Sequence, residues 1–98
     1  AHLLEGLPAE ALSGVFKRFI ASIFVFVIST ESNSGISVNE EFSVTKDVVS
    51  AGGAPELNVD DNIRVVFNGD VMESAPLQIG TVYAIYLLDE NGEVIPNN

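Results

Sequence analysis

The chain has 98 residues, of which 47% are hydrophobic and 18% charged, and its 4 basic and 14 acidic side chains give a net charge of −10. This length fits one domain, and the apolar fraction excludes wholesale disorder. Nucleic-acid binding is excluded because phosphate neutralisation needs clustered Lys and Arg. Cysteine is absent and His2 is the single histidine, which excludes disulfides, thiolate chemistry and multi-histidine metal sites.

The N-terminal segment predicts a short helical turn near residues 8–13. Pro8 precedes good helix formers and Glu10 lies early in the turn, as is typical of a helix start. The following residues have the composition of strands. We therefore divide the chain into an N-terminal extension, residues 1–13, and a β-domain, residues 14–98.

Two strands are expected next, over residues 14–20 and 22–30, although the spacing of the first also fits a helix. The apolar run Phe19–Ile28 is too short to span a membrane, which needs about 20 residues, and it predicts a buried core strand. Its length also fits the core of a signal peptide. Phe24 and Phe26 share one strand face, and core packing is the expected role of these aromatic rings.

The middle of the chain predicts a strand over residues 36–46 and then a long loop. The loop, residues 48–59, contains two glycines and a proline, which interrupt regular structure. Leu57 and Val59 are expected to anchor it to the core. Long exposed loops often carry binding residues, so this loop is also a candidate partner contact.

The C-terminal third predicts two further strands and two turns. Asn68-Gly69 follows the strand Ile63–Phe67 and is a strong hairpin signal, because both turn positions need a positive φ. Thr81–Leu88 forms the last long strand. Asp89–Gly92 is a second turn, after which Glu93–Pro96 returns briefly.

Turn signals about every ten residues separate five or six short strands, a pattern typical of a small barrel or sandwich. The hydrophobic runs are long for a sheet with one buried face. A closed barrel explains those runs and removes the sheet edges. We therefore predict a mainly all-β fold, a small five-stranded OB-like barrel preceded by the short helical turn.

The segment from residue 59 to 88 resembles the YobA-like domains, a family of unknown function from exported or lipid-anchored proteins of Gram-positive bacteria. The resemblance rests on Asp60-Asp61, Ile63–Phe67, Gly69, Glu73-Ser74-Ala75-Pro76, Gln78-Ile79 and Val82–Leu88. It implies an OB-like five-stranded barrel, export and no known catalytic activity. It supplies no functional residues.

A polar segment between the last strands provides the candidate binding residues Glu73, Ser74, Gln78 and Asp70. A serine beside a carboxylate suggests a nucleophile, but nucleophilic catalysis also needs a base and oxyanion donors. No histidine is suitably placed, and Lys46 is distant in sequence. The segment therefore favours a structural turn or a ligand contact, and we predict no enzymatic activity.

Acidic turns provide weak candidates for a metal site at Asp60, Asp61 and Asp70. Calcium takes six to eight oxygen ligands, and these carboxylates lack the spacing of a known calcium loop. Solvated turns are the simpler interpretation. No other cofactor is expected.

These observations favour a non-enzymatic exported or surface-tethered binding or accessory domain, whose partner is a protein or a small ligand. Cytoplasmic location and a tether through a removed or missing N-terminal segment both stay open. One alternative is an assembly subunit of the cell envelope that adds strands edge to edge, with Phe19–Ile28 as the sticky edge. Another is a weak calcium-binding module. A net charge of −10 disfavours anionic membranes overall.

Overall fold

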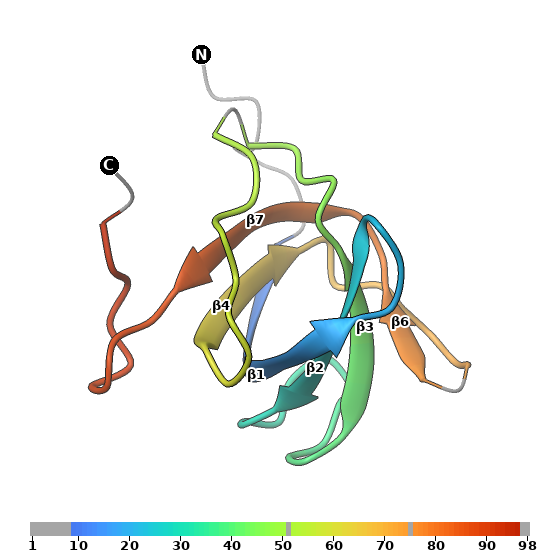
Figure 1. Ribbon diagram of the computed structural model, residues 1–98. Coiled ribbons are helices and arrows are strands. Elements are labelled where there is room, and N and C mark those ends of the chain that lie inside the picture. Colours follow the sequence, from blue (N-terminus) through green and yellow to red (C-terminus); the bar gives the residue numbers. More distant parts are fainter. Residues whose placement is uncertain (1–8, 51, 75, 97–98) are drawn as a thin grey trace.

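A computed structural model describes residues 9–50, 52–74 and 76–96. These residues form one strongly curved, mixed sheet of seven strands in the order β5-β6-β3-β2-β1-β4-β7 (Figure 1). The strands are β1 Glu10–Phe19, β2 Phe24–Ser29, β3 Glu41–Thr45, β4 Asn62–Phe67, β5 Val71–Met72, β6 Leu77–Ile79 and β7 Val82–Leu87. The described residues include no helix that could cross a membrane. The prediction of a mainly β fold is confirmed.

The first strand begins earlier than the sequence suggested. Residues 10–13 belong to β1 and pair with β4, so the helical turn predicted near residues 8–13 is wrong for them; Pro8 lies outside the described residues. Leu12 and Phe16 are buried at strand spacing. Pairing with a distant strand therefore outweighs the local helix signal. The boundary expected between residues 13 and 14 falls inside this strand.

β1 changes partner along its length. Its first half pairs with β4 and its second half with β2, and the two registers overlap at Gly14 and Val15. A side chain at Gly14 would overlap the Val27 side chain and lie 2.8 Å from the carbonyl oxygen of Ile28. Glycine is thus required where the strand bends from one neighbour to the other.

Two of the expected strands are shorter than predicted. Residues 20–23 form the turn between β1 and β2, so Phe19–Ile28 is not one continuous buried strand. β3 covers only the second half of the expected strand 36–46. Asn39 adopts a positive φ of 67° and the Glu40 carboxylate accepts a hydrogen bond from the Ser37 N–H at 2.9 Å, so these residues form a turn.

β4 and β5 form one arm of a long hairpin, and β6 and β7 form the other. Hydrogen bonds from Asn68 N to Thr81 O (3.0 Å) and from Gly80 N to Asp70 O (2.8 Å) connect the arms where each is interrupted. Asn68-Gly69 therefore bends one arm and does not reverse the chain, so the hairpin predicted there is wrong. The chain reverses between the end of β5 at Met72 and the start of β6 at Leu77.

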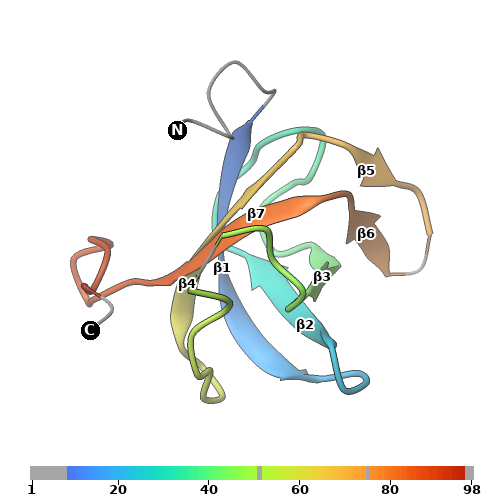
Figure 2. The same ribbon diagram turned by 90° about the horizontal axis from the view of Figure 1, so that it is seen from above.

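The long hairpin lies against both ends of the β1–β2–β3 meander. β6 pairs in parallel with β3, while β4 pairs antiparallel with β1. The hydrogen-bonded sheet is open, with β5 and β7 at its ends, and it has seven strands where five were predicted. Only Gly80 and Thr81 separate β6, the neighbour of the end strand β5, from the other end strand β7 (Figure 2).

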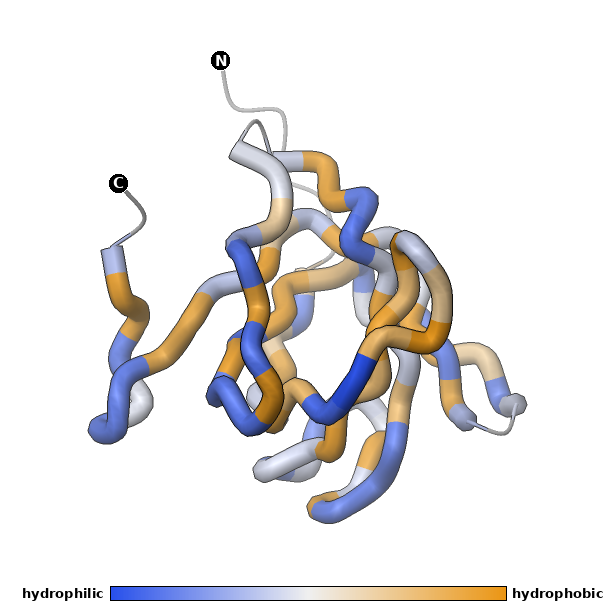
Figure 3. Tube along the Cα trace, in the orientation of Figure 1, coloured by the Kyte–Doolittle hydropathy of each residue, from blue (hydrophilic) through white to orange (hydrophobic). Residues whose placement is uncertain are grey.

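The core lies on the inner face of the curved sheet, and hydrophobic residues recur along the strands while several connecting turns are hydrophilic (Figure 3). Fully buried large side chains include Phe16, Phe42 and Phe67. Leu57 is buried and anchors the 48–59 loop as predicted. Val59 is 64% exposed, so its predicted anchoring role is wrong.

The outer edge of β7 is partly covered. The N–H groups of Val49 and Ser50 donate to carbonyls of β7, at 3.1 and 2.8 Å. At the other end, Ile95 N donates to Leu87 O at 2.8 Å, after the turn at residues 89–92. The brief return predicted for Glu93–Pro96 is confirmed by an isolated bridge between residues 88 and 94.

Candidate functional site

The outer face of β2, β3 and β6 carries a row of aligned side chains. Phe26 pairs with Ser43, and Ser43 pairs with Gln78. Val25 and Val27, the neighbours of Phe26 in β2, are fully buried on the inner face. Because alternate strand residues point to opposite faces, Phe24 and Phe26 lie on the outer face. The core role predicted for these two rings is therefore wrong, and both are half-buried.

A groove of about 310 Å³ lies on this outer face. The turn between β1 and β2 borders one side of it, and the turn between β5 and β6 borders the other. Its lining mixes apolar side chains with hydroxyl and amide groups, and none of the lining residues is charged: Ile20, Phe24, Ser43, Ser74, Pro76 and Gln78.

Both serines of the groove donate hydrogen bonds to backbone carbonyls. The Ser74 hydroxyl donates to Pro76 O at 2.6 Å, which fixes the turn before β6. The Ser43 hydroxyl donates to Leu77 O at 3.4 Å. Each hydroxyl oxygen keeps lone pairs that can accept a hydrogen bond from a ligand. The amide of Gln78 offers both donors and an acceptor.

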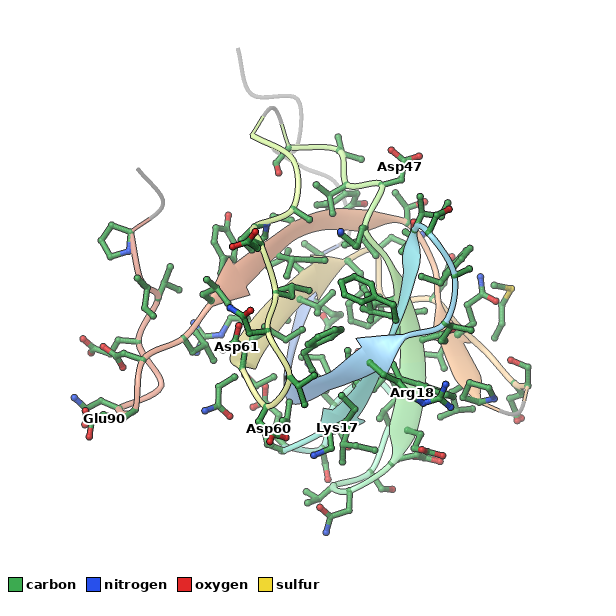
Figure 4. The ribbon with its side chains drawn as sticks, viewed as in Figure 1. Lys17, Arg18, Asp47, Asp60, Asp61 and Glu90 are labelled. Atoms are coloured by element: carbon green, nitrogen blue, oxygen red, sulfur yellow. The ribbon has the colours of Figure 1, made fainter. Side chains whose placement is uncertain are left out.

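Arg18 lies beside this face. Its guanidinium carbon is 4.2 Å from the ring centroid of Phe26, a cation–π contact. Figure 4 shows Arg18 on the side of β3 and β6, whereas Lys17, the preceding residue, lies beside Asp60. The pairing of β1 with β2 is irregular between residues 16 and 18, and this shift places Arg18 opposite Phe26 on the outer face.

The structure brings together two of the four predicted binding residues. Ser74 and Gln78 line the groove, while Glu73 and Asp70 do not. Asp70 instead accepts a hydrogen bond from the Asn68 amide at 3.2 Å, and its N–H donates to Asn68 Oδ1 at 3.0 Å. Asp70 thus shapes the bend between β4 and β5. Ala75 of the same motif lies outside the described residues.

Sequence reasoning missed Ile20, Phe24 and Ser43 as groove residues. The signal for Phe24 was present, since its alternation with valines placed it on one strand face. Which face points outward depends on the pairing of β2 with β3. Ser43 reaches the groove through the parallel contact with β6, which joins segments 34 residues apart. No local pattern encodes that contact.

The predicted metal candidates occupy two separate places. Asp60 pairs with Lys17 at 2.9 Å, and Asp61 accepts a hydrogen bond from Asn58 N at 2.8 Å. Asp70 lies at the other end of β4, and six strand residues span about 20 Å. Within residues 9–50, 52–74 and 76–96, no three Asp, Glu or His side chains are grouped to hold a metal ion.

Two other hollows are present. One, of about 210 Å³, lies between the 48–59 loop, β7 and the C-terminal segment, and its lining is mainly apolar. The other, of about 340 Å³, is polar and includes Glu31 and Arg64. Glu31 accepts a hydrogen bond from Ser13 N at 2.7 Å, and Arg64 donates to Gly92 O at 3.3 Å. Both charged groups therefore hold loops onto the sheet.

Comparison with protein-family models, with curated proteins and with solved structures finds no match to this chain.

Proposed function

We propose that this protein is a non-catalytic binding module built on an OB-like barrel. The path of strand pairing supports the OB-like description. If each interrupted arm of the long hairpin counts as one strand, the pairings run from β1 through β2 and β3 to the β6–β7 arm, then through the β4–β5 arm to β1. OB-folds are five-stranded, partly open barrels.

The position of the groove is the observation that carries the proposal. OB-folds bind ligands across the face of their second and third strands, between the turn that joins strands one and two and the turn that joins strands four and five. The groove lies on the outer face of β2 and β3. The turns at residues 20–23 and 73–76 border it, and they are the equivalent turns in the present chain.

The lining favours an uncharged polar ligand with an apolar face, such as a saccharide. Phe24 and Pro76 offer flat apolar surfaces, and Ser43, Ser74 and Gln78 offer hydrogen-bonding groups. Specific small-molecule sites combine such an apolar lining with a few polar groups that fix orientation. An oligonucleotide is disfavoured because the chain carries a net charge of −10.

Binding without chemistry is supported by the state of the serine hydroxyls. The hydroxyl of Ser74, the one candidate nucleophile of the sequence, donates a hydrogen bond to the carbonyl of Pro76. A nucleophilic serine needs a base in that position. The six residues of the groove lining include no carboxylate, histidine or lysine.

Mapping of small fragments by NMR tests this proposal without knowledge of the natural ligand. Cocktails of monosaccharides, small amides and aromatic fragments are added to ¹⁵N-labelled protein, and amide shifts are followed. We expect shifts to concentrate at Phe24, Ser43 and Gln78, because binding sites capture fragments of many kinds. The variant Gln78→Leu should weaken the polar hits and keep the aromatic ones.

The hollow beside β7 is the internal control. It is smaller, about 210 Å³ against about 310 Å³, and lies on another surface, around Pro55 and Ile85. If the hits cluster there, or if no residue of the groove shifts at millimolar fragment, the proposed binding face is wrong. The variant Tyr86→Ser alters that second hollow and should leave the groove hits unchanged.

A further inference from the structure

The turn between β1 and β2 exposes an unusual concentration of large hydrophobic side chains. Phe19, Ile20 and Ile23 are 48%, 45% and 46% exposed. We call the segment Phe19–Ile23 the hairpin tip. Among the described residues, most other exposed large hydrophobic side chains occur singly, which is normal for a protein surface. The hairpin tip is largely hydrophobic in Figure 3, whereas the turn at residues 89–92 is hydrophilic.

Part of the backbone of the hairpin tip is hydrogen-bonded within the protein. The N–H groups of Ile20 and Ala21 both donate to Phe24 O, at 2.8 and 3.3 Å. The carbonyl of Ile23 accepts a hydrogen bond from Lys46 N at 2.6 Å. Placing a peptide group in an apolar medium is costly when it lacks a partner. This turn can therefore enter such a medium at a lower cost than an open loop.

Two of the four basic residues of the chain, Arg18 and Lys46, lie beside the hairpin tip. Lys46 Nζ lies 4.9 Å from the ring centroid of Phe19, and Arg18 stacks on Phe26. Lys17 is paired with Asp60. Long basic side chains of this kind can lie along apolar surface while their charges reach a polar layer.

From these three observations we propose that the hairpin tip docks the protein on the surface of a lipid bilayer. Phe19, Ile20 and Ile23 would enter the boundary between headgroups and acyl chains, with Arg18 and Lys46 at the level of the phosphates. The apolar residues form a convex turn, which a fluid bilayer accepts without a complementary pocket. The hairpin tip shares Ile20 with the ligand groove, whereas Phe19 and Ile23 do not line the groove.

The charge near the hairpin tip determines how much anionic lipid should strengthen vesicle binding. Exposed charges farther than about 8 Å from one another are largely screened at physiological salt, so distant carboxylates have little effect at the hairpin tip. Asp60 pairs with Lys17, and Asp47 follows Lys46 in the chain, so Arg18 and Lys46 leave a small positive charge beside the hairpin tip. We therefore expect hydrophobic insertion to dominate and anionic lipid to strengthen binding by about fivefold, the effect of one additional basic residue near the surface.

Vesicle co-sedimentation tests the proposal with the intact chain. The probes are vesicles of pure phosphatidylcholine and of phosphatidylcholine with phosphatidylglycerol. We expect half-binding near 0.1–1 mM accessible lipid, on the order of that for a single acyl chain. The double variant Ile20→Ser with Ile23→Ser should weaken binding at least about tenfold on both vesicles, since it removes most of the inserted aliphatic surface. Lys46→Gln should reduce only the preference for anionic vesicles.

The matched control is the double variant Val38→Ser with Val59→Ser, which removes two side chains that are 50% and 64% exposed elsewhere. It should bind vesicles as the unchanged protein does. Thermal melts confirm that each variant is folded, and Ile23→Ser alone replaces the double variant if the latter is not. No binding at about 5 mM lipid, or equal loss in both double variants, overturns the proposal. So does a dimer that the tip variant abolishes, since a second copy would then cover the tip.

Discussion

At the scale of single residues, Gly14 explains how β1 serves two partners. The backbone of β2 approaches Gly14 so closely that a methyl group would meet Val27 and the carbonyl of Ile28. Because this carbonyl belongs to a paired strand in the middle of the sheet, it cannot move away without disturbing the ladder on both sides. The size of one side chain therefore controls the bend of the whole strand.

We predict that Gly14→Ala lowers the free energy of unfolding by about 1–3 kcal/mol, the usual cost of overpacking. This corresponds to a fall in Tm of several degrees, at about 4–8 °C per kcal/mol for a chain of this size. Gly52→Ala is the control, because a methyl group there meets no atom within 4 Å. A thermal melt in which both variants resemble the parent would contradict the role given to Gly14.

Ser29 is a second residue with a structural role beyond its size. It is fully buried, its hydroxyl donates to Ser37 O, and the same oxygen accepts a hydrogen bond from Glu40 N at 3.0 Å. The buried hydroxyl of Ser29 thus donates one hydrogen bond and accepts another, and it links β2 to the turn before β3. The 37–40 turn replaces the first half of the strand that the sequence predicted.

Replacing this hydroxyl should loosen that turn. We expect Ser29→Ala to cost about 1–2 kcal/mol, because it leaves Glu40 N and Ser37 O with only their long mutual hydrogen bond of 3.3 Å. Hydrogen exchange at Asn39 and Glu40 should accelerate. Ser37→Ala keeps the accepting carbonyl and should be close to neutral. Unchanged exchange in Ser29→Ala would show that backbone hydrogen bonds alone hold the turn.

At the scale of elements, local sequence patterns predicted where strands lie better than how the chain connects them. The strands predicted over Ile63–Phe67 and Thr81–Leu88 correspond to β4 and β7 to within one residue at each end. Asn68-Gly69 was misread because a two-residue turn signal does not show whether the chain reverses or only bends. The chain bends here because Asn68 and Asp70 form hydrogen bonds with each other and with the opposite arm of the hairpin.

The same limit applies to the candidate groove. The sequence predicted Ser74 and Gln78 as binding residues, because polar residues between strands often face solvent. The opposite wall comes from the β1–β2 turn, which the sequence had assigned to a buried strand. Its position beside the polar turn depends on the parallel pairing of β3 with β6. That pairing joins distant segments, so only the three-dimensional structure reveals it.

The close approach of Gly80, between β6 and β7, to the opposite arm of the long hairpin can be tested by substitution. A methyl group at Gly80 would lie 2.6 Å from Asn68 Oδ1 and 3.0 Å from Asp70 Cβ. We expect Gly80→Ala to lower the free energy of unfolding by about 1–3 kcal/mol through this crowding. Addition of Asn68→Ala should recover part of the loss, since the closest atom is removed. Additive losses would show that the two residues do not interact, because coupled neighbours deviate from additivity by at least about 0.5 kcal/mol.

At the scale of the whole molecule, the acidic charge is spread over separate turns. Asp60 and Asp61 precede β4, and Asp70 follows it. We expect the Tm to change by less than about 2 °C between EDTA and millimolar calcium, because these carboxylates do not converge. A bound ion at 100 times its Kd would add about 2.7 kcal/mol, or roughly 10–20 °C. A shift of that size would restore the calcium hypothesis.

The pairing of the long hairpin with both ends of the meander has a consequence for how the chain folds. The β1–β2 and β2–β3 pairings are local, but the contact between Lys17 and Asp60 spans 43 residues and that between Ser43 and Leu77 spans 34. Closing such loops costs chain entropy before the contacts form, and domains dominated by distant pairings fold in about milliseconds to seconds. We expect two hairpin units to form early and their docking to limit the rate. Until β6 reaches β3, the outer edge of β3 stays open, so aggregation during refolding should depend on the speed of that single step.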